Sequence, residues 1–252
     1  MALFSRRIRE RRPAAYLTHE AWLGDFRFYI DERVLVPRSF IADLLREDLA
    51  PWIPDRGGIR TALDLCTGSG CLAILLAHAF PHARIDAVDI SPGALAVARI
   101  NVREYRMSGR IRLAQSDMFS ALRGKHYDLI ISNPPYVRPA VMRRLPPEYR
   151  AEPVVALAGG ADGLDLVRLI VRTARRHLNP GGLLVVEVGH NRRRVERAYP
   201  GVAFTWPETS GGADCVFLLS REQLPRPNQL GNRAVASGNA RRRGRDGTSG
   251  RA

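Results

Sequence analysis

The residues Asn133, Pro134, Pro135 and Tyr136 form a group that could hold a planar NH2 group. They follow residues 127–132, a mostly apolar run that predicts a buried parallel strand, and the two prolines end that strand at a loop. Because a residue before proline is extended, the Asn133 amide is expected to point forward from the strand end. The Pro134 carbonyl can accept a hydrogen bond without a competing N–H donor, and Tyr136 adds a flat face.

Two acceptors and a flat platform suit the amino group of an adenine, a glutamine or an asparagine. The alternative interpretation is a proline-rich turn that only ends a strand. A functional loop is favoured because the motif follows a predicted strand and a second candidate ligand loop lies upstream of it.

The upstream loop is Asp64-Leu65-Cys66-Thr67-Gly68-Ser69-Gly70, between a predicted strand, Thr61–Leu65, and an apolar helix over residues 71–80. Small residues allow close approach of a ligand to the backbone, and free N–H groups at a helix start favour a carboxylate or phosphate. A glycine loop alone is weak evidence, since a dinucleotide-binding enzyme looks similar at this level and prefers three spaced glycines.

Asp89 narrows the chemistry of this loop. It ends a second predicted strand, residues 84–88, about 20 residues beyond the loop, where an acidic side chain can accept hydrogen bonds from ribose hydroxyls. Ser91 and Pro92 then begin a predicted helix over residues 93–105. The alternative role for Asp89 is helix capping alone.

Asp117 and Met118 end a third predicted strand, residues 112–116. Asp117 could accept from an adenine amino group and Met118 could cover the ring, although a turn aspartate and a core methionine would give the same spacing. In an open parallel sheet the ligand crevice lies beyond the carboxyl ends of the strands. Asp64, Asp89, Asp117 and Asn133 are therefore predicted to line one crevice.

This ordered set resembles the class I S-adenosylmethionine-dependent methyltransferases, and among them the PrmB-like glutamine methyltransferases of ribosomal proteins, which are related to the release-factor family HemK (PrmC). The resemblance extends from about Pro13 to Leu224. The passages that carry it further are Tyr16-Leu17-Thr18-His19-Glu20-Ala21-Trp22, Val34-Leu35-Val36-Pro37-Arg38-Ser39, Leu145-Pro146-Pro147-Glu148-Tyr149-Arg150-Ala151-Glu152-Pro153 and Gly163-Leu164-Asp165-Leu166.

The resemblance implies S-adenosyl-L-methionine as cofactor and a role for each motif. Cys66 through Gly70, after Asp64, would wrap the methionine part, and Asp89 would hold the ribose. The adenine would be framed by Asp117 and Met118. Asn133 through Tyr136 would hold the glutamine amide next to the cofactor, with Asn133, Pro134 and Tyr136 acting in catalysis. The chain departs from the family at Cys66, often glycine, and at Met118, often tryptophan in HemK-like members.

Alternating strand and helix patterns predict an α/β fold with a doubly wound, mostly parallel sheet of seven strands. Residues 183–188, 203–206 and 215–220 are its expected last strands, and the family adds that the final one is antiparallel. Alternation over residues 25–36 predicts an N-terminal β-hairpin. We expect three parts: residues 1–50 as the hairpin and a remnant of a helical substrate-recognition domain, 51–224 as the methyltransferase domain, and 225–252 as a disordered basic tail.

Composition excludes several classes of protein. With 252 residues and 45% hydrophobic content the chain can bury a core, and no apolar run reaches the roughly 20 residues that span a bilayer. The three cysteines lack metal-ligand spacing and the six histidines are scattered, so we expect no metal site. Unpaired cysteines fit a reducing, cytoplasmic location.

The net charge of +14 is concentrated at the chain ends. Residues 225–252 carry seven arginines against one aspartate, and residues 1–12 carry five against one glutamate. These ends could contact RNA weakly or could only keep the protein soluble. The expected partner is a ribosomal protein substrate, with a release factor as the alternative. A DNA adenine methyltransferase and a non-catalytic RNA-binding protein are the other function classes left open.

Overall fold

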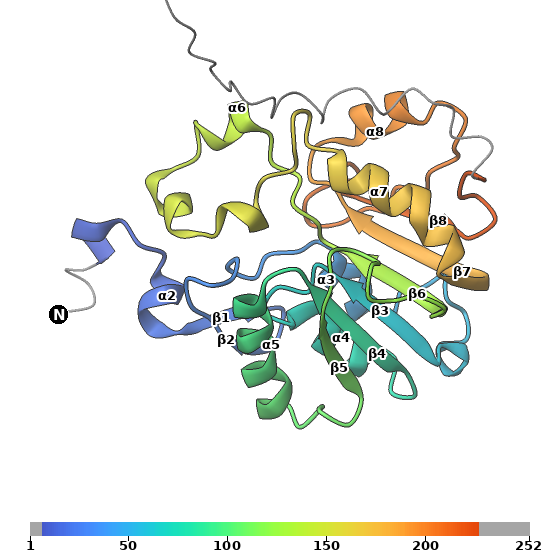
Figure 1. Cartoon of the computed structure of the whole chain (residues 1–252), viewed down its shortest axis with the longest axis horizontal. Coiled ribbons are helices and arrows are strands. Elements are labelled where there is room, and N and C mark those ends of the chain that lie inside the picture. The colour runs from blue at the N-terminus through green and yellow to red at the C-terminus, as the bar shows by residue number, and fades with distance from the viewer. Residues whose placement is uncertain (1–6, 227–252) are drawn as a thin grey trace, which may run out of the picture.

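The computed structural model describes residues 7–226, which form an open α/β sheet with helices on both faces (Figure 1). Residues 7–10 are helical, and their origin in a recognition domain stays a prediction. The expectations for residues 1–6 and for almost all of the basic tail lie outside the described residues. Within the described range no helix is long and apolar enough to cross a membrane.

The main sheet has the strand order β5-β4-β3-β6-β7-β8. All neighbours are parallel except β7 and β8, which are antiparallel. The strands are β3 (Thr61–Leu65), β4 (Arg84–Asp89), β5 (Ile111–Gln115), β6 (Tyr127–Ser132), β7 (Leu178–Glu187) and β8 (Val216–Ser220). From the neighbours β3 and β6 the chain winds outward in both directions, so the predicted doubly wound fold and its antiparallel last strand are confirmed.

The main sheet has six regular strands, whereas seven were expected. Residues 203–206 make only an isolated bridge, in which Thr205 exchanges backbone hydrogen bonds of 3.1 and 2.8 Å with Leu218. Pro207 follows almost at once, and because it has no N–H it cannot extend the pairing. β7 starts earlier than expected, at Leu178, with a register shift opposite Tyr127 and Leu129.

The helices divide between the two faces of the sheet. On one face lie α3 (Ile41–Arg46), α4 (Cys71–Ala79) and α5 (Pro92–Glu104). On the other lie α7 (Asp165–Thr173), the 3₁₀ turn η4 (Ala174–Arg176) and α8 (Arg192–Ala198). Alternate strand residues enter the two cores, as Ala62 and Leu63 do in β3. The shorter elements are α2 (Ala14–Thr18), η1 (Arg56–Gly58), α6 (Pro139–Met142), η2 (Pro147–Ala151) and η3 (Val154–Ala156).

The N-terminal hairpin is present, but its predicted extent over residues 25–36 is wrong. β1 (Glu20–Leu23) pairs with β2 (Phe26–Tyr29) in antiparallel register, with Leu23 opposite Phe26. Gly24 has a φ of 58°, a conformation that glycine adopts without strain and that allows the tight turn. Residues 26–29 were therefore recognised correctly as a strand. They were assigned to the wrong partner, because they pair with β1 and not with the residues that follow them.

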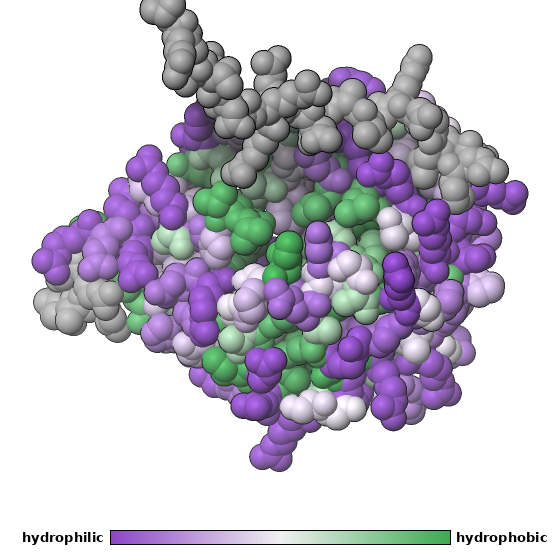
Figure 2. Space-filling view, in the orientation of Figure 1, coloured by the Kyte–Doolittle hydropathy of each residue, from purple (hydrophilic) through white to green (hydrophobic). Residues whose placement is uncertain are grey.

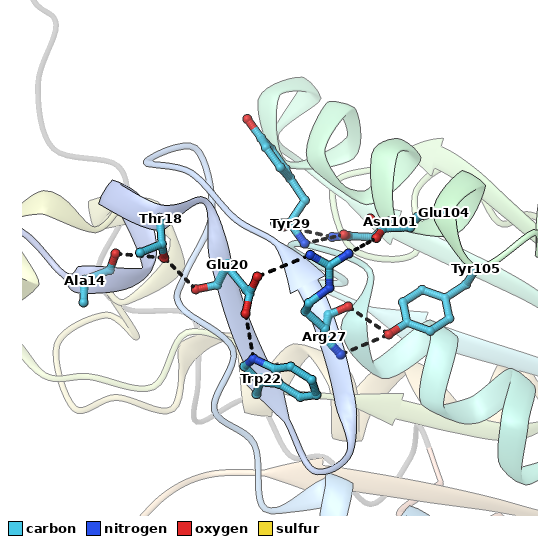
Figure 3. Close-up of polar contacts among 9 residues, drawn as sticks. All are labelled: Ala14, Thr18, Glu20, Trp22, Arg27, Tyr29, Asn101, Glu104 and Tyr105. Carbon is cyan, nitrogen blue, oxygen red and sulfur yellow. Dashed lines mark hydrogen bonds and ion pairs between the residues drawn. The ribbon is translucent and has the colours of Figure 1, made fainter. Parts of the chain in front are cut away.

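Asn101 of α5 joins the hairpin to this helix (Figure 3) and also holds the loop after β3. Its fully buried amide accepts from the Tyr29 N–H at 2.8 Å and donates to the Tyr29 carbonyl at 3.1 Å. The same NH2 group donates to the Ser69 carbonyl at 2.9 Å. Arg27 adds exposed contacts at the end of α5. Its backbone N–H donates to the Tyr105 hydroxyl, and its guanidinium donates to the Glu104 carboxylate.

Replacement of Asn101 by alanine should lower the free energy of unfolding by about 2–3 kcal/mol. Three buried backbone groups would lose their partner, and an unsatisfied buried polar group costs roughly 1–3 kcal/mol. The control is Gln115→Ala, which removes one exposed bond to the Ile90 carbonyl and should cost less than about 0.5 kcal/mol. Urea unfolding of both variants measures the difference, and equal losses would contradict the role of Asn101.

Candidate active site

A cavity of about 460 Å³ opens at the carboxyl ends of β3, β4, β5 and β6. Its size is within the range of small-molecule sites, and its place is the point where the strand order reverses. The sequence-predicted residues on its wall are Cys66, Thr67, Gly68, Ser69, Asp89, Asp117, Met118, Asn133 and Pro135. The predicted residues that do not line it are Asp64, Gly70, Pro134 and Tyr136.

The loop of residues 66–70 has a backbone that explains its small residues. Gly68 and Gly70 have φ values of 55° and 79°, and a β-carbon added at Gly70 would come within 3.1 Å of the Ala98 side chain. Glycine is needed at Gly70 both for its dihedral angle and for the close approach of α5. Cys66 also has a positive φ, 65°, which is unfavourable for a side chain and accounts for the family's usual glycine there.

Asp89 connects this loop to β4. Its two carboxylate oxygens accept from the Gly68 N–H and the Ser91 N–H, each at 2.9 Å. Burial raises the pKa of Asp89, while these backbone donors oppose the shift. A carboxylate oxygen can accept more than one hydrogen bond, so both oxygens retain acceptor capacity toward the cavity that Asp89 lines.

Negative charge gathers around Cys66. Burial raises the pKa of its thiol, and the carboxylates of Asp89, Asp64 and Asp117 raise it further, so the thiol stays neutral and is no nucleophile. Burial also raises the pKa of Asp64 to about 7. Thr67 donates to one Asp64 oxygen at 2.5 Å, and the other, Oδ1, is buried without a hydrogen-bond partner among the described residues.

Met118 lies against the loop of residues 66–70, on the side of the cavity where the adenine is predicted to bind. Its sulfur is 3.8 Å from the Cys66 sulfur, and both side chains line the cavity with Asp117. Met118 has a φ of 50°, which belongs to the turn that ends β5. Asp117 and Met118, which were predicted to frame an adenine, thus lie on the cavity wall, and their role stays a prediction.

Asn133 lies at the end of β6 with its amide orientation set by a neighbouring segment. Its NH2 group donates to the Arg38 carbonyl at 3.3 Å. The preceding residue, Ser132, is buried and donates to the Leu65 carbonyl at 2.7 Å, which fixes the strand end. No described residue donates to the Asn133 Oδ1 or to the Pro134 carbonyl, and of these two residues Asn133 lines the cavity.

Tyr136 is turned away from the cavity. Its hydroxyl donates to Glu187 at 3.0 Å, and its ring lies so close to Gly189 that a β-carbon there would be 2.7 Å away. Glu187 is buried at the end of β7 and also accepts from the Ser39 hydroxyl at 2.6 Å and the Phe40 N–H at 2.9 Å. Burial raises the pKa of Glu187, and the sequence prediction contained no role for this residue.

Residues 137–160, the roof segment, cover one side of the cavity through residues such as Pro153 and Ala156. They form the excursion between β6 and α7 (Figure 1). The roof segment is joined to the sheet by Arg38, whose guanidinium makes bonds of 2.7 and 2.6 Å to buried Glu152 and lies 4.8 Å from the centre of the Tyr149 ring. Figure 2 shows apolar surface near the middle of this face, bordered by hydrophilic surface.

Two site segments that sequence reasoning left without a role are residues 33–39 and the roof segment. Both line the cavity, and both contain passages that had been used only as marks of family resemblance. Their signal was a distinctive run of residues in which no group stood out as a catalytic or ligand-binding side chain. Because they act through backbone groups and ion pairs, residue type alone did not reveal their function.

The cavity suits a cationic nucleoside ligand. The carboxylates of Asp89 and Asp117 line the cavity, an arrangement that favours positive charge there. S-adenosyl-L-methionine carries a sulfonium and an ammonium group with a ribose diol, so the residues present fit this cofactor. No group of described residues could hold a metal ion.

Comparison with solved structures agrees with the fold. A methyltransferase from Pyrococcus furiosus matches 88% of this chain and 99% of its own with a TM-score of 0.56 and 18% identity. The catalytic domain of human METTL16 in complex with an RNA hairpin of MAT2A matches 77% of this chain and 74% of its own, with a TM-score of 0.54 and 18% identity. At these identities the likeness establishes the Rossmann-like fold alone.

Comparison with protein sequences establishes the family. Residues 44–144 match the family model of the methyltransferase small domain. A ribosomal protein uL3 glutamine methyltransferase of Neisseria meningitidis is 58% identical over 89% of this chain and 74% of its own length. The proteins of the same name from Bordetella pertussis and Burkholderia pseudomallei are 55% and 52% identical over 88% and 89% of this chain, and 74% and 76% of their own.

Together with the cavity and its motifs, these matches make the chain a methyltransferase that uses S-adenosyl-L-methionine. The chain belongs to the family of the ribosomal protein uL3 glutamine methyltransferases.

Proposed function

We propose that this enzyme transfers a methyl group from S-adenosyl-L-methionine to the side-chain amide nitrogen of a glutamine in ribosomal protein uL3. The observation that carries the proposal is the pair of free acceptors at the end of β6, the Asn133 Oδ1 and the Pro134 carbonyl, beside a cavity that fits the cofactor. Sequence relatives with the same named activity support the substrate.

An amide nitrogen is a poor nucleophile because its lone pair is delocalised into the carbonyl. Hydrogen bonds from the substrate NH2 group to Asn133 Oδ1 and the Pro134 carbonyl hold both N–H bonds and direct the lone pair toward the reacting methyl group. S-adenosyl-L-methionine supplies that methyl group on a positively charged sulfur. Fixing two reactants in this way can contribute about 7–11 kcal/mol.

The same two acceptors stabilise the transition state. As the new N–C bond forms, positive charge grows on the nitrogen, and its N–H groups become stronger donors to both oxygens. No histidine or lysine is present on the part of the cavity wall that the structure describes. None is required before attack, because a methylated amide nitrogen is acidic and releases its proton to solvent afterwards.

Tyr136 acts by position in this scheme. Its bond to Glu187 holds one end of the Asn133–Tyr136 loop, and the bond from Asn133 to the Arg38 carbonyl holds the other. Glu187 and Arg38 thus orient the amide-binding loop by holding its two ends. A ribosomal-protein substrate also implies that the enzyme works in the cytoplasm.

Asp89→Ala should weaken binding of S-adenosyl-L-methionine at least tenfold, because charge-assisted hydrogen bonds of this kind contribute roughly 1.5–3 kcal/mol. Asp128→Ala is the matched control, since that carboxylate also accepts two backbone N–H bonds of 2.9 Å but lies outside the cavity. Calorimetry on folded variants measures both affinities. Unchanged affinity in Asp89→Ala would remove Asp89 from the cofactor site.

Asn133→Ala should leave cofactor affinity nearly intact and lower kcat for uL3 by about 10²-fold or more, as expected when one preorganised transition-state contact is lost. Asn179→Ala, which removes a bond to Asp128 away from the cavity, should leave kcat unchanged. The assay is methyl transfer to purified uL3 and to release factor, read by mass spectrometry. Wild-type turnover in Asn133→Ala would refute the mechanism, and preference for release factor would refute the substrate.

Tyr136→Phe should lower kcat several-fold while KM for the cofactor stays the same, because the amide-binding loop loses one of its two fixed ends. Tyr127→Phe is the control, since Tyr127 is buried and donates to the Asp86 carboxylate at 2.7 Å, outside the cavity. Each variant should lose about 1 kcal/mol of stability, but only Tyr136→Phe should lose turnover. Equal kcat values in the two variants would show that the Glu187 bond has no part in positioning.

A further inference from the structure

The helices on one face of the sheet carry far more positive charge than those on the other. α7, η4 and α8 together contain eight arginines against Asp165 and Glu196. α3, α4 and α5, on the opposite face, contain three arginines against Asp43 and Glu104. The chain is rich in arginine throughout, with 39 lysines and arginines, so composition alone would not produce this difference between faces.

Four of these eight arginines make neither an ion pair nor a side-chain hydrogen bond with the described residues, namely Arg172, Arg176, Arg193 and Arg197, and they are called the arginine face here. Three of them are exposed, and Arg172 is half-buried. The other four guanidinium groups are engaged. Arg168 and Arg192 make ion pairs, Arg175 donates to backbone carbonyls at residues 221–224, and Arg194 donates to Asn191.

α7 and α8 lie on the same face of the sheet (Figure 1). Burial raises the pKa of Tyr199, at the end of α8, and Arg172 of α7 opposes that shift, so its charge is near α8. Arg193 and Arg197 are four residues apart in α8, and i,i+4 side chains are neighbours on a helix. Arg172 lies in the last turn of α7 and Arg176 in the 3₁₀ turn that follows directly, so they add two further positive charges to this face.

The surface chemistry fits a phosphate backbone better than a membrane. None of the exposed large apolar side chains of the described chain belongs to α7 or α8, so nothing is available to insert among lipid tails. Guanidinium groups make bidentate hydrogen bonds to phosphate oxygens. Unpaired, exposed arginines on a helix surface give attraction to a polyanion that does not depend on its sequence.

The arginine face is also connected to the active site through α7, the helix that contains Arg172. Asp165 and Leu166, in the first turn of α7, line the cavity, and the arginines follow along that helix. A positively charged enzyme and a ribosomal protein, which is made to bind RNA, repel each other at long range. RNA carried by the substrate would reverse that repulsion.

We propose that the arginine face binds the sugar-phosphate backbone of RNA, so that the enzyme takes up its ribosomal-protein substrate while that protein is attached to RNA. This inference rests on the proposed function for the identity of the substrate. It places the RNA contact on α7 and α8 rather than on the basic chain ends alone.

The test is RNA binding by the full chain and by two variants that lose equal charge. One replaces Arg172, Arg176, Arg193 and Arg197 by glutamine. The control replaces four exposed arginines of the opposite side by glutamine, Arg46, Arg99, Arg103 and Arg106. Fluorescence anisotropy with a short labelled RNA hairpin is measured between about 50 and about 200 mM salt. Both variants keep the same chain ends, so those charges cancel in the comparison.

The arginine-face variant should bind RNA at least tenfold more weakly at low salt, and its plot of log K against log salt should be shallower by about 3, close to one phosphate contact per arginine. The control should retain wild-type affinity and slope. Equal losses in both variants, or none in the arginine-face variant, would overturn the proposal. If the arginine-face variant lost binding to phosphatidylglycerol vesicles but still bound RNA, the proposal would be overturned in favour of a membrane surface.

Methyl transfer separates this inference from the proposed function. The arginine-face variant should methylate free uL3 at the wild-type rate and should lose only the stimulation that wild type gains when uL3 is supplied with ribosomal RNA. If neither wild type nor any variant methylated uL3, uL3 would be refuted as the substrate. The RNA-binding measurement could still be interpreted. Equal rates with and without RNA in wild type would refute the coupling between RNA and substrate.

Discussion

The buried carboxylate of Glu187 holds the active site together. It accepts hydrogen bonds from Ser39, from the Phe40 backbone and from Tyr136, which are far apart in sequence. The segment next to Ser39 supplies the carbonyl that orients the Asn133 amide. One buried acceptor with three donors thus sets the geometry of the loop that we propose binds the substrate, and burial of a charge requires such partners.

Negative and positive charges are concentrated in different regions of the molecule. Carboxylates surround the cofactor cavity, where they favour a cationic ligand and keep the Cys66 thiol neutral. Arginines gather on the outer surface of α7 and α8, away from those carboxylates. Beside the cavity, the Arg38–Glu152 ion pair links the roof segment to the loop that contains Asn133.

Much of the fold and part of the site could be predicted from local sequence. The strand that ends at Asn133 and the one that ends at Asp89 each have an apolar run followed by a residue with clear chemistry, so their positions were predicted correctly. The hairpin was assigned to the wrong partner strand because alternation identifies a strand but not its neighbour. Residues 203–206 have strand-like composition, yet only Thr205 finds a partner, since pairing depends on the adjacent edge of the sheet.

The sequence by itself determined which residues could do chemistry, because acceptor groups, glycine dihedral angles and proline constraints are properties of single residues and their immediate neighbours. Only the tertiary structure decided which of them face the cavity. It turned Tyr136 toward Glu187 instead of toward the ligand, and it brought Arg38 to Asn133 across 95 residues of chain. Long-range contacts of this kind depend on how strands and helices pack, and no short stretch of sequence contains that information.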